Sequence, residues 1–161
     1  LAPVARIWRN HPDIRKWCRQ SDLISDRDQA DWFERQSKDP TIKMYGIAAD
    51  ESPVGVCGLT SIDLINRRAE FSVYVNRNDW GRGFGRKALS TLLTHGFNSL
   101  GLNSIWGESF DGNPAMKLFE DLGFKKEGVR RQFYFRNGSY IDAHLFSILA
   151  AEWKEKCSSR S

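Results

Sequence analysis

A glycine-rich loop between a strand-like and a helix-like segment constrains this chain more than any other feature. Residues 80–85 read WGRGFG, directly after an alternating segment at 69–76 and directly before a helical stripe at 86–100. Glycines let backbone N–H groups turn toward one anion, and the amino end of a helix adds partial positive charge. The loop therefore predicts a phosphate-binding turn, with a tight connection of purely structural use as the alternative.

Two familiar phosphate motifs do not fit this loop. There is no G-x-x-x-x-G-K-[ST], and G-x-G-x-x-G fails because Arg86 stands where the third glycine is required. The chain also lacks the alternating strand and helix series of a nucleotide-binding α/β sheet. A dinucleotide oxidoreductase is therefore disfavoured. Arg82, Arg86 and Lys87 offer cations to the outer phosphate oxygens.

The remaining sequence predicts an α+β fold with a twisted, mainly antiparallel sheet flanked by helices. Before the loop, apolar spacing indicates two short helices within 4–20, interrupted at Pro12, and a helix that begins at Ser25. Segments 43–49, 53–62 and 69–76 read as a three-stranded meander. After it, the chain reads as helix 86–100, strand 104–110, helix 114–122, and a hairpin of 129–136 with 140–149 around Asn137-Gly138.

Length and charge limit the classes of protein. The 161 residues suit one domain, predicted at 1–153, and a polar tail at 154–161 that is expected to fray. The net charge of +4 comes from scattered basic residues, which favours a nucleotide-sized anion over nucleic acid. No apolar run is long enough for a membrane span. The three cysteines and three histidines are too dispersed for disulfides or a metal site, which predicts a cytoplasmic protein with no metal.

Two segments resemble the signatures of the GNAT N-acetyltransferases. Residues 69–75, AEFSVYV, followed by 80–89, WGRGFGRKAL, look like the acetyl-CoA motif of that family, and 113–124, NPAMKLFEDLGF, resembles its second signature. Glu127-Gly128, residues 138–142 and Glu152-Trp153 are similar to the branch that contains ribosomal-protein N-terminal acetyltransferases. The resemblance covers nearly the whole chain.

The resemblance implies that acetyl-CoA is the co-substrate and inserts where the sheet splays near strands 69–76 and 104–110. The strand offers backbone groups to the pantetheine arm and thioester carbonyl, the loop holds the pyrophosphate, and an asparagine lies near the thiol. The cofactor-binding residues implied are Phe71, Val73, Tyr74, Val75, Arg82, Gly83, Phe84, Gly85, Arg86 and Asn113. The first strand of the family precedes its first helix and is not found in the printed sequence, which leaves it truncated, disordered or absent.

Catalytic groups are less well marked. Glu70 and Glu108 on predicted strands are candidates for the general base, and a carboxylate paired to Arg67 or Arg68 is the structural alternative. Phe119 stands where the family often has a tyrosine that protonates the leaving thiolate, and phenylalanine cannot donate a proton. The remaining candidates for a hydroxyl donor are Tyr140, Tyr134 and Ser109. No cysteine lies beside a histidine in the sequence, which favours direct transfer in a ternary complex over an acyl-enzyme.

The acceptor is expected to be a primary amine, either a protein or peptide N-terminus or an amino-sugar nucleotide. Residues 9–12, RNHP, and 23–34 resemble amino-sugar-nucleotide N-acetyltransferases of bacterial nonulosonic acid synthesis. Aromatic residues gather in the first helices and the last hairpin, where they stack a planar group or simply pack. A non-catalytic acyl-CoA sensor on the same fold is the alternative function. Monomer and homodimer both stay open.

Overall fold

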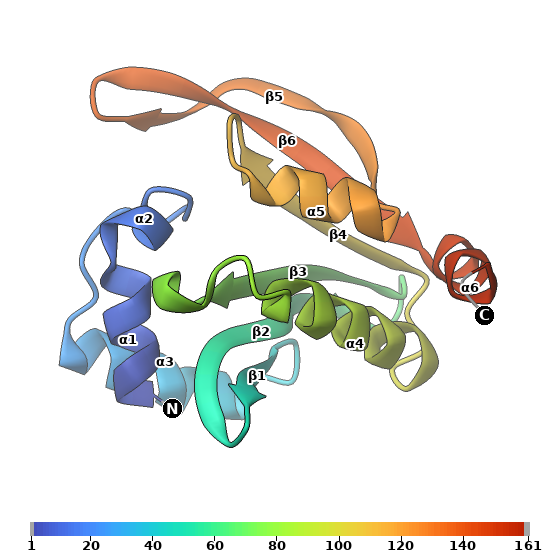
Figure 1. The fold of residues 1–161 in the computed structure, drawn as a ribbon, viewed down its shortest axis with the longest axis horizontal. Coiled ribbons are helices and arrows are strands. Elements are labelled where there is room, and N and C mark those ends of the chain that lie inside the picture. Colours follow the sequence, from blue (N-terminus) through green and yellow to red (C-terminus); the bar gives the residue numbers. More distant parts are fainter. Residues whose placement is uncertain (1, 160–161) are drawn as a thin grey trace. The chain divides into compact units, whose positions relative to one another are not determined.

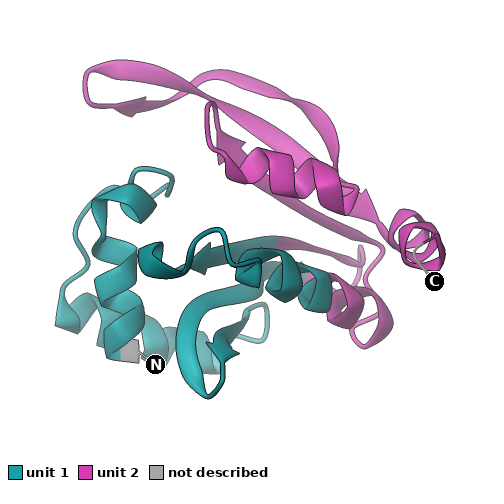
Figure 2. Cartoon of the chain, in the orientation of Figure 1, with its two compact units in different colours: residues 1–62, 71–92 teal, residues 63–70, 93–161 magenta. Residues whose placement is uncertain are grey.

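Two compact units make up residues 2–159, the part of the chain that the computed structural model describes (Figure 2). Unit 1 contains the described residues up to Ile62 together with Phe71–Leu92, and unit 2 contains Asp63–Glu70 and the described residues from Leu93 onward. Two strands, the first of them by its last residue only, and one helix run from one unit into the other. None of the helices within the described residues is long and apolar enough to cross a membrane.

Unit 1 is built from helices, a strand pair and the glycine-rich loop. Its elements are α1 (Ala2–Asn10), α2 (Pro12–Arg15), α3 (Asp26–Lys38), β1 (Lys43–Ala49), β2 (Ser52–Asp63), most of β3 (Arg68–Val75), the 3₁₀ turn η1 (Arg77–Asp79) and the first part of α4 (Phe84–Asn98). The break at Pro12 and the start after Ser25 confirm the sequence prediction. Buried Val54, Val56, Leu59, Phe71 and Leu89 form its core.

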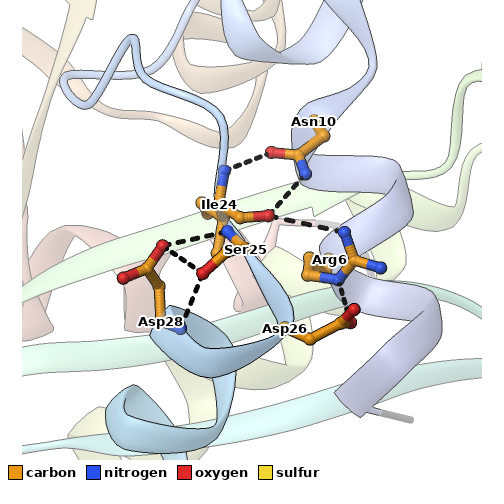
Figure 3. Close-up of polar contacts among 6 residues, drawn as sticks. All are labelled: Arg6, Asn10, Ile24, Ser25, Asp26 and Asp28. Atoms are coloured by element: carbon orange, nitrogen blue, oxygen red, sulfur yellow. Dashed lines mark hydrogen bonds and ion pairs between the residues drawn. The ribbon is translucent and has the colours of Figure 1, made fainter.

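The connection between α1 and α3 shows how side chains of unit 1 close a loop (Figure 3). Asn10 clamps the backbone of Ile24, because its Oδ1 accepts from Ile24 N and its Nδ2 donates to Ile24 O, each at 2.8 Å. Ser25 and Asp28 form a reciprocal capping box that satisfies the first N–H groups of α3. The Asn10 of the RNHP segment therefore has a structural use here.

Unit 2 contains the second half of the sheet and its covering helices. Its elements are β4 (Ser104–Phe110), α5 (Ala115–Leu122), β5 (Lys125–Arg136), β6 (Ser139–Leu149) and α6 (Ala150–Ser158), with the end of α4 and the start of β3. Asn137 and Gly138 both have positive φ, 51° and 80°, as a two-residue hairpin turn of type I′ requires. Gly123 ends α5 in the left-handed region at φ 97°. Both turns were predicted from the sequence.

The sheet has the strand order β1-β2-β3-β4-β6-β5, which confirms the α+β prediction. The pairs β1–β2, β4–β6 and β5–β6 are antiparallel, whereas β3 pairs with β4 in parallel, from Arg68↔Ser104 to Glu70↔Trp106. The orange and red hairpin of β5 and β6 extends beyond the end of β4 within unit 2 (Figure 1), because Phe110 of β4 already pairs with Ala143.

The strand register assigns the side chains of unit 2 to two faces, because directly opposed residues share a face. Glu108 is opposite Leu145 and Phe110 is opposite Ala143, whereas Ser109 and His144 point to the other face. We call these the glutamate face and the serine face. Helix α5 covers the serine face, where the rings of Phe119 and Phe146 lie 5.7 Å apart, edge to face.

Several element boundaries differ from the sequence prediction; strand β5, for example, begins at Lys125 rather than at residue 129. Helix α4 begins at Phe84 rather than Arg86, so Phe84 and Gly85 belong to its first turn and not to the loop. Helix α6 continues to Ser158, so residues 154–158, expected to fray because they are polar, are helical. Trp153 explains the difference, since its ring is buried and its Nε1 donates to Thr94 Oγ1. The last two residues of the proposed tail lie outside the described residues.

Candidate functional site

The loop before α4 is tied down on its strand side by side-chain hydrogen bonds. Trp80 Nε1 donates to the carbonyl oxygen of Val75 at 2.9 Å, which closes the segment that follows β3. Asp79 accepts from Asn76 Nδ2 through one oxygen and from Arg82 Nη1 through the other, at 2.9 and 2.6 Å. The carboxylate thus directs Arg82 while its guanidinium stays largely exposed. The loop is therefore pre-organised in unit 1.

The glycines of the loop keep its backbone open. Gly81 and Gly83 have φ of 77° and 82°, a region that side chains with a Cβ rarely adopt, and no atom lies within 4 Å of the position of an added Cβ. The first turn of α4 carries Arg86 and Lys87 and no acidic residue. Open backbone N–H groups, a helix amino end and several cations match the chemistry of a pyrophosphate.

Substitution of Gly83 by alanine tests this interpretation. An alanine at position 83 would have a positive φ, which costs about 1 kcal/mol when a Cβ is present. If the backbone rotates to relieve this strain, the N–H groups of the loop no longer point toward one anion. We expect the KM for acetyl-CoA to rise about fivefold to tenfold. Steady-state kinetics measures this, with Gly112→Ala as a control because Gly112 also has positive φ and open space but lies outside the loop. Equal effects of both variants would contradict the assignment.

Strand β3 contains four of the residues that the family resemblance assigns to the cofactor. Phe71 is buried, and Val73, Tyr74 and Val75 are half-buried. Burial raises the pKa of Tyr74 to about 12, so its phenol stays protonated at neutral pH. Strand β2 lies close beside this stretch, since a Cβ on Gly55 would stand 2.5 Å from the carbonyl oxygen of Tyr74. The glycine therefore sets the position of the Tyr74–Val75 backbone.

Asn113 begins the helix of the second signature. Its backbone N–H donates to Phe110 O at 3.1 Å, and its Oδ1 accepts from Ala115 N at 3.0 Å. These bonds join the end of β4 to α5. The structure therefore gives Asn113 a local role in positioning α5, in addition to the cofactor contact that the family resemblance implies.

Glu108 forms a compact polar cluster on the glutamate face. Its Oε2 accepts from Arg130 Nη1 at 3.0 Å, and its Oε1 accepts a short hydrogen bond from the Tyr134 hydroxyl. The Glu108 side chain is only 4% exposed, whereas Arg130 is 44% exposed. The structure thus joins a candidate base to a candidate hydroxyl donor. Arg130 was not among the sequence candidates, because it lies 22 residues from Glu108 and no motif marks it.

The other catalytic candidates lie elsewhere. Glu70 is buried on β3 and pairs with Trp106 of β4. Tyr140 is 65% exposed in the distal hairpin, where its ring lies 5.0 Å from that of Phe135. It is five residues along β6 from Leu145, the cross-strand partner of Glu108, which corresponds to about 17 Å along the strand. Tyr134, rather than Tyr140, is the tyrosine beside Glu108.

Ser109 presents an unusual hydroxyl on the serine face. The residue is 4% exposed, and its Oγ is buried without a hydrogen-bond partner among residues 2–159. Phe119, where the family often has tyrosine, is packed against Phe124 and Phe146 on that face. A buried hydroxyl without a partner costs about 1 to 3 kcal/mol, so this hydroxyl lowers the stability of the fold unless a further group pairs with it.

Cysteine and metal chemistry receive no support from the described residues. Burial raises the pKa of the Cys57 thiol to about 11 and also raises that of Cys18, which keeps both protonated and weakly nucleophilic at neutral pH. No group of three or more His, Cys, Asp or Glu side chains in the described part of the chain is arranged to hold a metal ion.

Comparisons with known proteins agree with the predicted fold and family. The model of the acetyltransferase (GNAT) domain family matches residues 1–125. The N-acetyltransferase p20 of Bacillus licheniformis is 33% identical over 156 residues, covering 93% of this chain and 87% of that protein. YdaF of Bacillus subtilis, provisionally named a ribosomal N-acetyltransferase, is 29% identical over 155 residues, which cover 92% of this chain and 84% of that protein.

A solved structure matches the fold. The spermidine N-acetyltransferase of Vibrio cholerae, in complex with CoA and spermine, superposes with a TM-score of 0.88 and 24% sequence identity, over 95% of this chain and 92% of that one. The family match and the likeness to p20 identify the donor and the reaction. The chain belongs to the GNAT acetyltransferase family and is an acetyl-CoA-dependent N-acetyltransferase.

Proposed function

We propose that the acceptor is a primary amine on a molecule that also bears negative charge, with an amino-sugar nucleotide as the best match. The observation that carries this proposal is the combination of arginines and exposed aromatic rings on the distal hairpin of β5 and β6. Arg130, Arg131 and Arg136 lie there, and Phe133, Phe135 and Tyr140 are each more than half exposed. Guanidinium groups suit phosphates, and aromatic rings stack on a base.

The arrangement of these side chains supports a planar, anionic ligand. The Arg130 guanidinium lies over the Phe133 ring at 4.9 Å, and the Phe133 ring meets Tyr134 edge to face at 5.2 Å. That guanidinium is bonded to Glu108, so we assign the contact with an acceptor phosphate to Arg131. Along Lys125–Arg136, five side chains are basic and one is acidic. This excess makes the hairpin a poor surface for a polyamine.

A protein or peptide N-terminus is the second candidate acceptor. The likeness to YdaF and the segment 138–142 favour it, since that segment is similar to the ribosomal-protein branch. The spermidine enzyme that shares the fold makes a polyamine the third acceptor to test. The basic side chains of the hairpin distinguish the three acceptors, because only the amino-sugar nucleotide carries two phosphates in addition to its amine.

We assign the chemistry to Glu108 and Ser109. In direct transfer, a bond forms between the amine nitrogen and the acetyl carbon, and the bond from that carbon to sulfur breaks. Glu108 takes the proton that the nitrogen loses, and the Ser109 hydroxyl donates a hydrogen bond to the departing sulfur. A thiol has a pKa near 8.5, so its thiolate leaves without full protonation in the transition state. The reaction can therefore proceed with Phe119 at the position where the family often has a proton-donating tyrosine.

An acceptor panel tests the proposal. Acetyl-CoA consumption is measured with an amino-sugar nucleotide, a peptide with an acidic N-terminal region and spermidine. We expect kcat/KM for the amino-sugar nucleotide to exceed that for spermidine at least tenfold. A tenfold preference requires only about 1.4 kcal/mol of additional attraction between the basic hairpin and the phosphates. Preferred acetylation of spermidine would contradict the proposed acceptor, and acetyl-CoA binding without turnover of any amine would support the non-catalytic alternative.

Removal of one hairpin charge provides the matched test. Arg131→Gln is expected to raise the KM for the amino-sugar nucleotide about twofold to fivefold, because one exposed ion pair contributes up to about 1 kcal/mol. Lys126→Gln is the control, since it removes the same charge from the same strand near α5. A KM that changes equally in both variants would show that only the net charge of the protein matters.

A further inference from the structure

A bulge in β5 lies beside the polar cluster around Glu108. Arg130 pairs with Ala143 and Tyr134 pairs with Ile141, so Arg131, Gln132 and Phe133 together stand opposite Asp142 alone. In a regular strand, residues four apart are about 13 Å from each other. Here Arg130 and Tyr134 stand opposite residues only two apart, which corresponds to about 7 Å. The bulge thus brings both side chains to one carboxylate.

Asp142 holds the bulge from the opposite strand. Gln132 has a φ of 50°, in the left-handed region, and its N–H donates to Asp142 Oδ1 at 2.7 Å. The backbone carbonyl of Asp142 accepts in turn from Asp111 N at 3.0 Å, beyond the end of β4. A left-handed non-glycine residue costs about 1 to 2 kcal/mol, which a hydrogen bond to a charged acceptor offsets. Bulges next to active sites commonly re-aim a side chain.

Both oxygens of Glu108 already accept hydrogen bonds from Arg130 and Tyr134, so a direct contact with the incoming amine would have to break one of them. The Tyr134 oxygen, in contrast, donates its proton to Glu108 and keeps acceptor capacity. Tyr134 is half-buried, with one ring side against Phe110 at 4.6 Å. The phenol is therefore the member of the cluster suited to meet the amine.

We propose that Tyr134 and Glu108 form a two-step proton relay and that Arg130 and Asp142 are its positioning residues. This inference rests on the proposed function, in which Glu108 receives the amine proton. Tyr134 is the catalytic residue: its oxygen accepts the proton from the nitrogen as its own proton passes to Glu108. One N–H bond breaks, one O–H bond forms on Glu108, and the phenol is regenerated unchanged. Arg130 balances the charge of Glu108 before transfer.

The charged groups that face this cluster include Arg136, whose guanidinium lies 5.4 Å from the centre of the Tyr134 ring and 5.9 Å from that of the Phe110 ring. Arg130 comes from β5, and the opposing β6 positions on the glutamate face, Ala143 and Leu145, carry no charge. Glu70 of β3 is placed on the same face by its register with Trp106. Asp142 and His144 are assigned by register to the serine face, where His144 Nε2 lies 2.8 Å from Asp111 Oδ1.

The pH dependence of the Tyr134→Phe variant tests the relay. Without a base, only amine molecules that are already neutral react, so the rate of the variant rises up to tenfold per pH unit until the pKa of the amine. We expect kcat/KM for the amine to fall about 100-fold or more near pH 7 and the deficit to close at high pH. Tyr45→Phe, on β1, is the control and should leave the profile unchanged. A deficit that is the same at each pH would overturn the relay.

Two further substitutions separate positioning from folding. Asp142→Asn keeps an oxygen that accepts from Gln132 N and is expected to retain most of kcat, whereas Asp142→Ala releases the bulge and lowers kcat about tenfold or more with the KM for acetyl-CoA unchanged. Arg130→Lys should recover part of the kcat lost in Arg130→Met. Equal kcat in the Asn and Ala variants would overturn the positioning role. An enzyme that acetylates no amine at any pH would overturn both the relay and the proposed function.

Discussion

Replacement of Glu108 by glutamine is expected to lower kcat by roughly 10²- to 10⁴-fold, the usual contribution of a positioned general base. Glutamine has nearly the same shape and keeps an oxygen that accepts from the Tyr134 hydroxyl, but it cannot take up a proton at neutral pH. Its amide NH₂ would also face Arg130 Nη1, which needs an acceptor. The KM for acetyl-CoA should not change, because the loop at residues 80–86 is not altered. Steady-state kinetics with a saturating acceptor measures the loss.

Glu127→Gln is the matched control for this prediction. Glu127 is a carboxylate of β5 that accepts from Ser147 Oγ at 2.6 Å, and it has no part in the proposed chemistry. We expect its kcat to stay within about twofold of the native value. Circular dichroism of both variants checks that each is folded. A folded Glu108→Gln enzyme with the kcat of the control would exclude Glu108 as the final proton acceptor.

Replacement of Phe146 by alanine is expected to lower the free energy of unfolding by about 3 to 5 kcal/mol. Phe146 is 1% exposed on β6, where its ring meets that of Phe119 and anchors α5 to the sheet. Truncation removes apolar burial and leaves a cavity that the surrounding strands cannot fill. Because folded domains are stable by only about 5 to 15 kcal/mol, such a loss is a large share of the total. Urea denaturation followed by fluorescence measures it.

Phe133→Ala is the control, since it removes the same atoms from a ring that is 53% exposed on the distal hairpin. Its effect on the free energy of unfolding should stay below about 1 kcal/mol. Similar losses in the two variants would show that α5 is not held by the ring cluster that contains Phe119 and Phe146. That result would also contradict the explanation that position 119 is a phenylalanine because its ring packs against Phe146.

The helix ends and tight turns could be predicted from the sequence because each depends on a few neighbouring residues. Ser25 with Asp28, Gly123 and Asn137-Gly138 specify a helix start, a helix end and a hairpin turn through local hydrogen bonds and positive φ. The extent of α6 could not be predicted in this way. Residues 154–158 are polar, and their helix depends on Trp153, whose ring is buried and bonded to a distant Thr94.

By itself, the sequence predicted a phosphate-binding loop from neighbouring glycines and cations at a strand-to-helix junction, and its two signatures indicated the family. The tertiary structure alone decided which catalytic candidates meet. Glu108, Arg130 and Tyr134 come together through the β4–β6–β5 register and a bulge held by Asp142, and none of these is encoded by local spacing. Proton transfer needs contact within about 3 Å, and here the contacts between residues distant in the sequence arise when the strands pair.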